Sequence, residues 1–433
     1  MSHSDGFHCT DCPTVIPCGT INDVWTVRTS ICFIRRYRVR MLEFWQTFML
    51  VNAVCLVGTA IIAILDHLFY PPLPAGASAE HRHEQPRPRV TILIPARNEE
   101  ANIEGCVLSA FNQTYPDLEV IVVDDNSTDR TGDLLRELAA VDDRLTVVEG
   151  QPLPEGWIGK GWALYQGHQK ATGKWIMLLD ADVRLEPWAV DQLVARAERQ
   201  NIDFLNPYPY FVNVSFWEKV MQPLLWGIVR IRFPLIFVNQ RLTRRNPAFA
   251  MAFGPCILVR KESYDAVGGH RHVAMDILED VALAKLMRNR GYRTCVLNGK
   301  NLLRVRMYHN LRELMDGWGK TAYGAMGYNL PLMLAAVFGL TFAAAQPFAT
   351  LAWGAITANQ TWMSLGLFQV LGVMWRRILD HNENDFPLWT ILLHPVAIMV
   401  VLYIQLRAVW QYYFGAYRWK DRQYHKPKPA STK

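Results

Sequence analysis

The longest apolar stretches of the chain lie near its two ends, and a segment of alternating strand-like and helix-like patterns lies between them. No charged side chain occurs in residues 44–65, 321–375 or 386–406. Each of these stretches is long enough to cross a hydrocarbon layer of about 30 Å as a helix. We therefore predict a membrane helix over residues 41–70 and two or three more over residues 321–412, with a break near 358–360. The alternative is a set of buried core helices in a large soluble protein.

The segment between these stretches predicts a mostly parallel sheet. Strand-like apolar runs at residues 89–96, 118–125, 144–150 and 174–179 alternate with helix-period patterns at residues 98–111, 129–141 and 160–172. Strands and helices that alternate in this way indicate an α/β fold with helices on both faces of the sheet. In such a fold, functional residues are expected at the carboxyl ends of the strands.

The remaining segments lack such patterns. Residues 71–88 are rich in Pro, His and Arg and are typical of an extended linker. Residues 1–40 show no periodicity, so we expect an irregular segment and hypothesise that the natural start is Met41. Cys9 and Cys12 have the spacing of half a zinc knuckle, but no second pair follows at ligand spacing. Residues 413–433 form a basic tail.

The charge of the chain is uneven, although its net value of +6 is modest. Arg and Lys cluster at residues 35–40, 230–245, 288–306 and 418–433, beside apolar segments. This placement favours contact with anionic lipid headgroups. No nucleic-acid-binding motif accompanies the clusters, so we expect a lipid bilayer and no nucleic acid as partner.

Acidic and polar residues follow three of the predicted strands, in the sequences PARNEE, VDDNSTDRT and DADVR. Carboxylates that meet at a strand-end crevice repel one another unless a cation joins them. Asp180 and Asp182 offer hard oxygen ligands that suit Mg²⁺ or Mn²⁺ and are poor for zinc. The alternative is that Asp182 caps the next helix and Asp180 is a turn residue.

These motifs resemble the family 2 glycosyltransferases with the GT-A fold. TILIPARNEEANIEGCVLSAFNQTYPDLEVIVVDDNSTDRT and LLDAD carry the resemblance, which covers roughly residues 89–320. Residues 152–167, 264–270 and 277–293 resemble more narrowly the membrane enzymes that glycosylate lipids. Among them are the hopanoid-associated and carotenoid-acid glycosyltransferases and, more distantly, ceramide glucosyltransferase. The fold class implied is a GT-A nucleotide-sugar-binding domain with transmembrane helices on both sides.

The resemblance assigns roles to individual residues. Asp180 and Asp182 would hold the metal, and Asp280, beside Glu279 in an E-D pair, would be the base that deprotonates the acceptor. An ordinary helix-capping pair is the alternative. Lys160 before a predicted helix would meet the diphosphate, and its alternative is a solvated loop lysine. The donor site would comprise Pro95, Ala96, Arg97, Asn98, Glu99, Asp124, Asp125, Lys160, Asp180, Trp318 and Lys320.

The sequence departs from the family at a motif that often reads (Q/R)-x-x-R-W. LMDGWGK keeps Trp318 but has Gly317 where the family has arginine. Lys320, or Arg306 upstream, is then expected to provide the missing positive charge.

The acceptor is expected at residues 215–245, which are apolar and aromatic but contain Pro223 and Pro234. Burying Arg230 and Arg232 in a full span would be costly, so a helix in the membrane interface is favoured, with Trp226 on its apolar face. A partly buried surface helix is the alternative. His270 is a candidate metal or acceptor contact, although a lone histidine is more often structural.

Together these features predict an inverting enzyme that moves a hexose from a UDP-sugar to the hydroxyl or carboxylate of a membrane lipid. We expect it in the bacterial inner membrane, with the catalytic domain in the cytoplasm. The alternatives are a processive polysaccharide synthase and a membrane scaffold that has lost catalysis.

Overall fold

The computed structural model describes residues 21–76, 87–326, 328–384, 386–414, 417–419 and 422–424. The chain divides into two units, residues 1–55 and 56–433. The site and the sheet belong to the second unit, and the description below concerns mainly that unit.

Helix α1 (Ile21–Phe69) begins well before the predicted membrane helix. The irregular segment expected over residues 1–40 is therefore wrong for residues 21–40. The reason is that neither glycine nor proline occurs between Gly19 and Gly58, so nothing in this part of the sequence breaks a helix. Residues 1–20, which hold Cys9 and Cys12, and residues 77–86 of the predicted linker lie outside the described residues.

Seven strands form the main sheet in the order β3-β2-β1-β4-β8-β6-β9. They are β1 (Val90–Ala96), β2 (Leu118–Asp124), β3 (Leu145–Glu149), β4 (Trp175–Leu179), β6 (Phe204–Tyr208), β8 (Cys256–Arg260) and β9 (Thr294–Asn298). Strand β8 runs antiparallel to β4 and β6, and the other pairs are parallel. The predicted mostly parallel sheet is confirmed, and its first four strands are those expected from the sequence.

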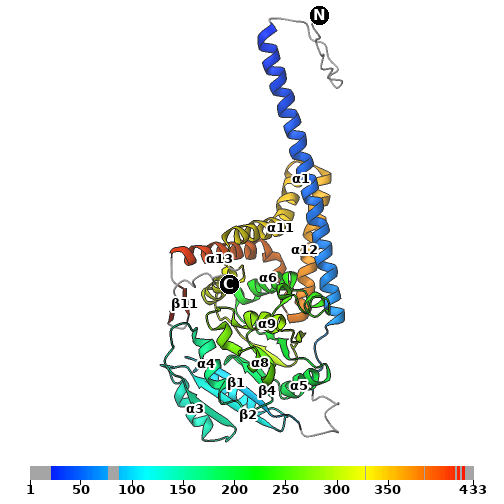
Figure 1. The fold of residues 1–433 in the computed structure, drawn as a ribbon. Coiled ribbons are helices and arrows are strands. Elements are labelled where there is room, and N and C mark those ends of the chain that lie inside the picture. Colours follow the sequence, from blue (N-terminus) through cyan, green and yellow to red (C-terminus); the bar gives the residue numbers. More distant parts are fainter. Residues whose placement is uncertain are drawn as a thin grey trace, which may run out of the picture. The chain divides into compact units, whose positions relative to one another are not determined.

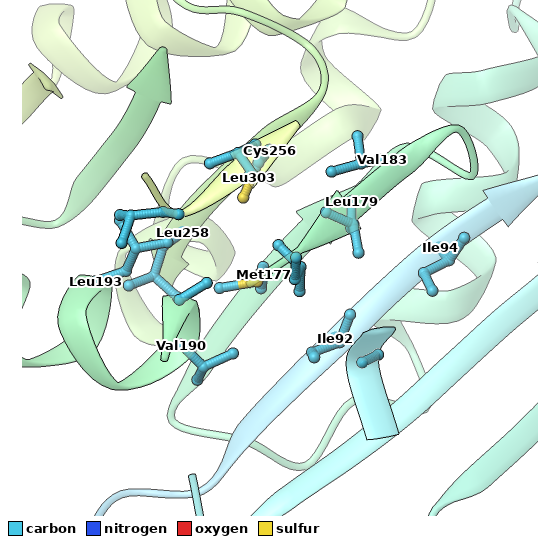
Figure 2. Close-up of a cluster of buried hydrophobic side chains, with 14 of the residues drawn as sticks. Ile92, Ile94, Met177, Leu179, Val183, Val190, Leu193, Cys256, Leu258 and Leu303 are labelled. Atoms are coloured by element: carbon cyan, nitrogen blue, oxygen red, sulfur yellow. The ribbon is translucent and has the colours of Figure 1, made fainter. Parts of the chain in front are cut away.

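Helices cover both faces of this sheet (Figure 1). Alternate residues of one strand face opposite ways: Ile92 of β1 joins the core beneath α2 and α5, whereas Leu93 joins the core beneath α4 and α9. Figure 2 shows the first of these cores, where Val190 and Leu193 of α5 lie near Met177 of β4. The helices are α2 (Ile103–Phe111), α3 (Thr131–Ala139), α4 (Gly159–His168), α5 (Ala189–Arg199), α8 (Lys261–Ala266) and α9 (Glu279–Asn289).

A second, smaller sheet of three short strands extends the site. It contains β5 (Val183–Leu185), β10 (Leu303–Val305) and β7 (Tyr210–Phe211), in the order β5-β10-β7. Strand β10 pairs antiparallel with β5, and Val305 lies opposite Val183. This pairing brings the chain that follows β10 close to the carboxyl end of β4, beside Asp180 and Asp182.

Among the described residues, four segments are long and apolar enough to cross a membrane: Glu43–Phe69, Phe216–Val238, Leu330–Ile356 and Leu388–Phe414. The second comprises α6 (Phe216–Arg232) and α7 (Leu235–Val238), where we expected an interfacial segment. The third and fourth comprise α11 (Leu330–Ile356) and a 3-10 helix (Leu388–Leu393) followed by α13 (His394–Phe414). Half of the most apolar part of Phe216–Val238 is buried inside the protein.

Helix α12 (Gln360–Asn384) is not one of these candidates, which corrects the expectation of two spans within residues 321–375. The predicted break at residues 358–360 is confirmed, but the helix after it continues through Arg376 and Arg377. The uncharged stretch therefore ends inside α12. Helices α11 and α12 pack so closely that a Cβ on Gly354 would lie 2.5 Å from the Met363 backbone nitrogen. Small residues permit such contacts between apolar helices.

The remaining elements are the helix that follows β10, two short strands near the carboxyl end and two 3-10 helices. They are α10 (Leu311–Ala325), β11 (Tyr417–Trp419), β12 (Arg422–Tyr424) and the 3-10 helices Pro247–Phe249 and Gly269–Val273. Strands β11 and β12 form an antiparallel pair in the basic tail.

A single buried arginine fixes the loop that follows α7. Arg288 of α9 is 2% exposed, and its guanidinium donates to the carbonyls of Val238 (2.7 Å) and Thr243 (3.2 Å) and to Thr294 Oγ1 (2.8 Å). Because these acceptors are partly or fully buried, losing their donor would leave polar groups without a partner.

Replacing Arg288 by methionine should therefore destabilise the fold by about 3 kcal/mol, since it removes several hydrogen bonds at once. The matched control is Arg290→Met, which changes an exposed arginine at the end of the same helix. Thermal unfolding of the two purified variants measures the difference. Equal unfolding temperatures would contradict this role of Arg288.

Candidate functional site

A cleft of about 360 Å³ lies where the carboxyl ends of β1, β2 and β4 meet the chain after β10. Most of the residues predicted for the donor and metal sites line it. They are Pro95, Ala96, Arg97, Asn98, Glu99, Asp125, Lys160, Asp180, Asp182, Glu279 and Lys320. Three predicted loops thus converge on one crevice, as the strand-end rule for parallel sheets requires.

The loops after β1 and β2 hold each other in place. The Arg97 side chain donates to the carbonyl of Asp125 at 2.6 Å, and the Thr128 backbone N–H donates to Asn98 Oδ1 at 2.9 Å. Asn98 has a φ of 50°, in the left-handed region that asparagine tolerates. Asp125 lines the cleft and is 4% exposed. Hydrogen bonds between the two loops hold this part of the cleft, which is rich in donors and acceptors.

Asp124, which we also predicted for the donor site, does not line the cleft. Its Oδ1 accepts from the backbone N–H of Ser127 at 3.0 Å, so the side chain fixes the turn after β2. Neighbouring residues at the end of a strand point to opposite sides. Only Asp125 of the pair therefore faces the cleft.

Lys160 joins two acids at the centre of the cleft. Its ammonium lies 2.7 Å from Asp180 Oδ1 and 3.0 Å from Glu279 Oε1. Burial alone would lower the pKa of Lys160, but Asp180 and Glu279 outweigh it and raise the pKa above its ordinary value. Burial likewise acts to raise the pKa of Glu279, and Lys160 and Lys320 outweigh that effect, so this pKa is lowered. Both groups are therefore charged at neutral pH.

Asp280 lies beside the cleft, in a smaller cavity of about 10 Å³ that Lys160, Asp180, Gly254 and His270 also line. Burial, and then the charge of Glu279, raises the pKa of Asp280 to about 7. Gly254 makes the cluster possible, because a Cβ there would lie 3.2 Å from the Lys160 ammonium and 3.4 Å from Asp280. A carboxyl group with this pKa can take up and release a proton near neutral pH.

His270 is buried behind the cleft. Its backbone N–H donates to Tyr264 Oη at 3.0 Å, and its Nδ1 shares a second hydrogen bond of 2.6 Å with the same hydroxyl. Burial lowers the pKa of His270 to about 4, and the ring is neutral. Because Tyr264 occupies Nδ1, this nitrogen is not available to a metal.

Asp180 and Asp182 are the residues suited to a divalent cation. Both line the cleft and offer carboxylate oxygens, which Mg²⁺ and Mn²⁺ prefer. The described residues contain no group of three or more His, Cys, Asp or Glu side chains arranged for a metal. The pair therefore fits an ion that takes its other ligands from water and phosphate oxygens, as Mg²⁺ usually does.

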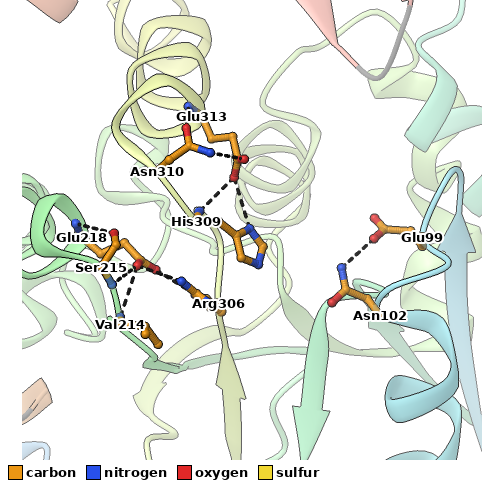
Figure 3. A network of polar contacts seen from close by, with 9 residues as sticks. All are labelled: Glu99, Asn102, Val214, Ser215, Glu218, Arg306, His309, Asn310 and Glu313. Carbon is orange, nitrogen blue, oxygen red and sulfur yellow. Dashed lines mark hydrogen bonds and ion pairs between the residues drawn. The ribbon is translucent and has the colours of Figure 1, made fainter.

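The opposite wall of the cleft comes from the chain after β10 and contains residues that the donor-site prediction did not include (Figure 3). Arg306 Nε and Nη2 lie 3.0 Å and 3.1 Å from the two carboxylate oxygens of Glu218. His309 and Glu313 also line the cleft, and their side chains contact each other at 3.2 Å. Of these residues, Glu218 belongs to a motif that the sequence shows. Ser215 and Glu218 form the S-x-x-E capping box at the start of α6.

The remaining predicted residues do not line the cleft. Trp318 and Trp226 pack against each other with ring centroids 5.3 Å apart, in an aromatic group below it. Arg230 lines a separate small cavity that contains Asp66, and the Arg232 guanidinium lies over the Phe233 ring.

The departure from the R-W motif has a steric reason. A Cβ on Gly317 would lie 2.4 Å from the Tyr308 ring, so this position of α10 cannot hold an arginine while Tyr308 keeps its place. Lys320 and Arg306, the two residues expected to compensate, both line the cleft.

Gly317→Ala should consequently destabilise the protein by about 1–3 kcal/mol, because overpacking outweighs the better helix propensity of alanine. Gly319→Ala is the control in the same helix, since a Cβ there meets only Gln411 Oε1 at 3.8 Å. Thermal unfolding should show a lower unfolding temperature for Gly317→Ala than for Gly319→Ala. Replacing Tyr308 by leucine in the Gly317→Ala variant should restore its stability. A Gly317→Ala variant as stable as Gly319→Ala would refute the clash.

The chain is similar in sequence to known glycosyltransferases. Residues 91–268 match the model of the family described as Glycosyl transferase family 2. The 4,4'-diaponeurosporenoate glycosyltransferase of Staphylococcus aureus (strain MRSA252) is 29% identical over 343 residues, which cover 77% of this chain and 88% of that protein. The same enzyme of strain bovine RF122 / ET3-1 gives the same values.

Two solved structures are also similar. The mannosyltransferase PcManGT of Pyrobaculum calidifontis, in complex with GDP-Man and Mn²⁺, is 18% identical with a TM-score of 0.46 and covers 78% of this chain and 99% of that one. S. aureus TarS 1-349 in complex with UDP is 14% identical with a TM-score of 0.37 and covers 79% and 97%.

The strand-end cleft therefore lies in a region that is similar to glycosyltransferases. Residues 91–268 match the family 2 model, so the expected resemblance is confirmed, and the mostly parallel sheet agrees with the fold class that it implies. The chain adds to this region apolar helices of the length needed to cross a membrane.

Proposed function

We propose that the protein transfers a hexose, with inversion, from a UDP-sugar to the carboxylate or hydroxyl of a membrane lipid. The observation that carries the proposal is the cleft at the carboxyl ends of β1, β2 and β4, which combines acids with the cationic residues Lys160, Arg306 and Lys320. A nucleoside diphosphate needs donors for its phosphates and acceptors for its base and ribose. The walls of the cleft offer both.

The lipid acceptor is supported by two independent features. The curated relative acts on 4,4'-diaponeurosporenoate, a carotenoid acid, and the similarity covers 77% of this chain. The segment Phe216–Val238 is apolar enough to meet a bilayer, and its first turn contains Glu218, which contacts the cleft residue Arg306. A lipid headgroup could reach the cleft from this side while its tail remains in the membrane. We place the catalytic domain on the cytoplasmic side of a bacterial inner membrane, where nucleotide sugars are made.

Asp180 and Asp182 would hold Mg²⁺ or Mn²⁺ in this proposal. When bound, the ion would neutralise the negative charge that develops on the leaving diphosphate. Residues of the chain would bind the phosphates and the nucleoside. Lys160 stands at the first turn of α4, where a helix end favours an anion, and Arg97 and Asp125 frame the nucleotide end.

Asp280 is the proposed base for a hydroxyl acceptor. Its pKa of about 7 allows it to accept a proton, whereas Glu279 is paired with Lys160 and has a lowered pKa. A group with a pKa near the working pH is the better base. Glu279 would instead keep Lys160 oriented.

Asp182→Asn should lower the transfer rate by about a hundredfold or more because it removes a metal ligand, and Asp280→Asn should do the same for a hydroxyl acceptor because it removes the base. Transfer of labelled sugar from UDP-sugar to membrane lipid in the presence of Mn²⁺ is the measurement. The control is Asp124→Asn, since Asp124 lies outside the cleft. Full activity of either site variant would refute the role of that residue, provided that all variants unfold at similar temperatures.

The pH dependence of the wild-type enzyme should follow Asp280 if the acceptor is a hydroxyl. The base acts when deprotonated, so kcat/KM should fall about tenfold per pH unit below the Asp280 pKa of about 7 and level off above it. A profile that stays flat from pH 5 to pH 8 would exclude Asp280 as the base.

A further inference from the structure

We propose that Arg306 is a diphosphate-binding residue and that Glu218, buried beneath it, is the residue that aims it into the cleft. The proposal rests on the nucleotide-sugar donor of the proposed function. It assigns to Arg306, one of the two residues expected to supply the missing positive charge, a defined ligand group, and it adds Glu218, which no sequence motif indicated for the site. This assignment follows from the hydrogen bonds of the Arg306 guanidinium, which occupy one of its two edges.

A guanidinium has five N–H groups, which form two edges that can each bind an oxyanion with two parallel hydrogen bonds. Glu218 takes the edge made by Nε and Nη2, at 3.0 Å and 3.1 Å. The second edge, made by Nη1 and the other hydrogen of Nη2, receives no acceptor from the described residues. Arg306 lines the cleft, and its side chain is 32% exposed. The unoccupied edge is therefore available to a ligand in the cleft.

Glu218 is built to hold this orientation. Its side chain is 1% exposed, and one of its oxygens also accepts from the backbone N–H groups of Val214 and Ser215. Burial tends to raise the pKa of Glu218, but the hydrogen bonds from Arg306 and Ser215 outweigh it, and the pKa is lowered. The carboxylate is thus ionised and fixed at the first turn of α6. An arginine fixed in this way loses little conformational entropy when it binds an anion.

The strand register indicates which anion Arg306 meets. In the antiparallel pair of β5 and β10, Val305 lies opposite Val183. Arg306 is the first residue after β10, and Asp182 is the residue directly before β5. Arg306 therefore stands beside the second acid of the D-x-D motif, and both residues line the cleft. The phosphates of the donor are the anion expected at this place, and a bidentate edge matches two phosphate oxygens.

The test measures the binding of UDP and of GDP, with Mn²⁺, to the full-length protein in detergent by isothermal titration calorimetry. For the nucleotide that the wild type binds more tightly, Arg306→Gln should raise the Kd on the order of tenfold to a hundredfold, as expected for a lost charged hydrogen-bond pair. Arg306→Lys should fall in between, because lysine keeps the charge but not the two-pronged edge. The Kd of the corresponding nucleoside monophosphate should change less.

Arg304→Gln is the matched control. Arg304 precedes Arg306 by two residues, forms its own ion pair with Glu186 and does not line the cleft, so its loss should leave the Kd unchanged. Glu218→Gln should weaken nucleotide binding less than Arg306→Gln does. If Glu218→Gln does not fold, the comparison of Gln and Lys at position 306 decides the proposal.

Three outcomes would overturn the inference. One is an Arg306→Gln variant that binds the nucleoside diphosphate as the wild type does. Another is an unchanged Kd for the nucleotide with a raised KM for a carboxylic-acid lipid, which would place Arg306 at the acceptor instead. A wild type that binds neither UDP nor GDP would refute the proposed function itself, whereas a defect in the Arg306 variants and a smaller one in Glu218→Gln, with Arg304→Gln unaffected, supports both.

Discussion

The attraction between one lysine and the acids around it holds the site together. Asp180 follows β4, and Glu279 and Asp280 lie in the first turn of α9. Their carboxylates share a partly buried region where like charges repel. Lys160 lies between two of them, and Gly254 leaves room for the group because it has no side chain. The lysine cannot neutralise three acids. Burial, and after it this repulsion from Glu279, raises the pKa of Asp280 above that of an ordinary aspartate.

The two walls of the cleft differ in how far the sequence predicts them. The wall made by β1, β2 and β4 was predictable, because buried parallel strands are continuous runs of apolar and β-branched residues that end in polar loops. Asp124 and Asp125 show the limit of that pattern, since both follow the same strand and only Asp125 reaches the cleft. Which of two adjacent residues faces a site depends on where the strand ends, and sequence patterns locate strand ends poorly.

The wall that contains Arg306 could not be predicted in the same way. It rests on strands of two and three residues, which are too short to show a period, and on contacts between residues far apart in sequence. The long apolar helices show a related limit. Absence of charge located α11 and α13, but it did not reveal that α12 continues past Trp375 into a charged segment or that α1 begins at Ile21. Composition marks apolar stretches, whereas helix ends depend on capping and packing.

Glu218 connects the apolar helix α6 to the donor cleft. Its carboxylate caps α6 through Ser215 and at the same time binds Arg306, so one side chain fixes both the start of the helix and a wall of the cleft. Trp226, farther along α6, packs in the aromatic group that contains Trp318 of α10, the helix that also carries Lys320. A shift of α6 would therefore displace Arg306 as well as this aromatic group. If Phe216–Val238 meets a bilayer, as the proposed function requires, the position of this segment and the geometry of the Arg306 wall would be linked through Glu218.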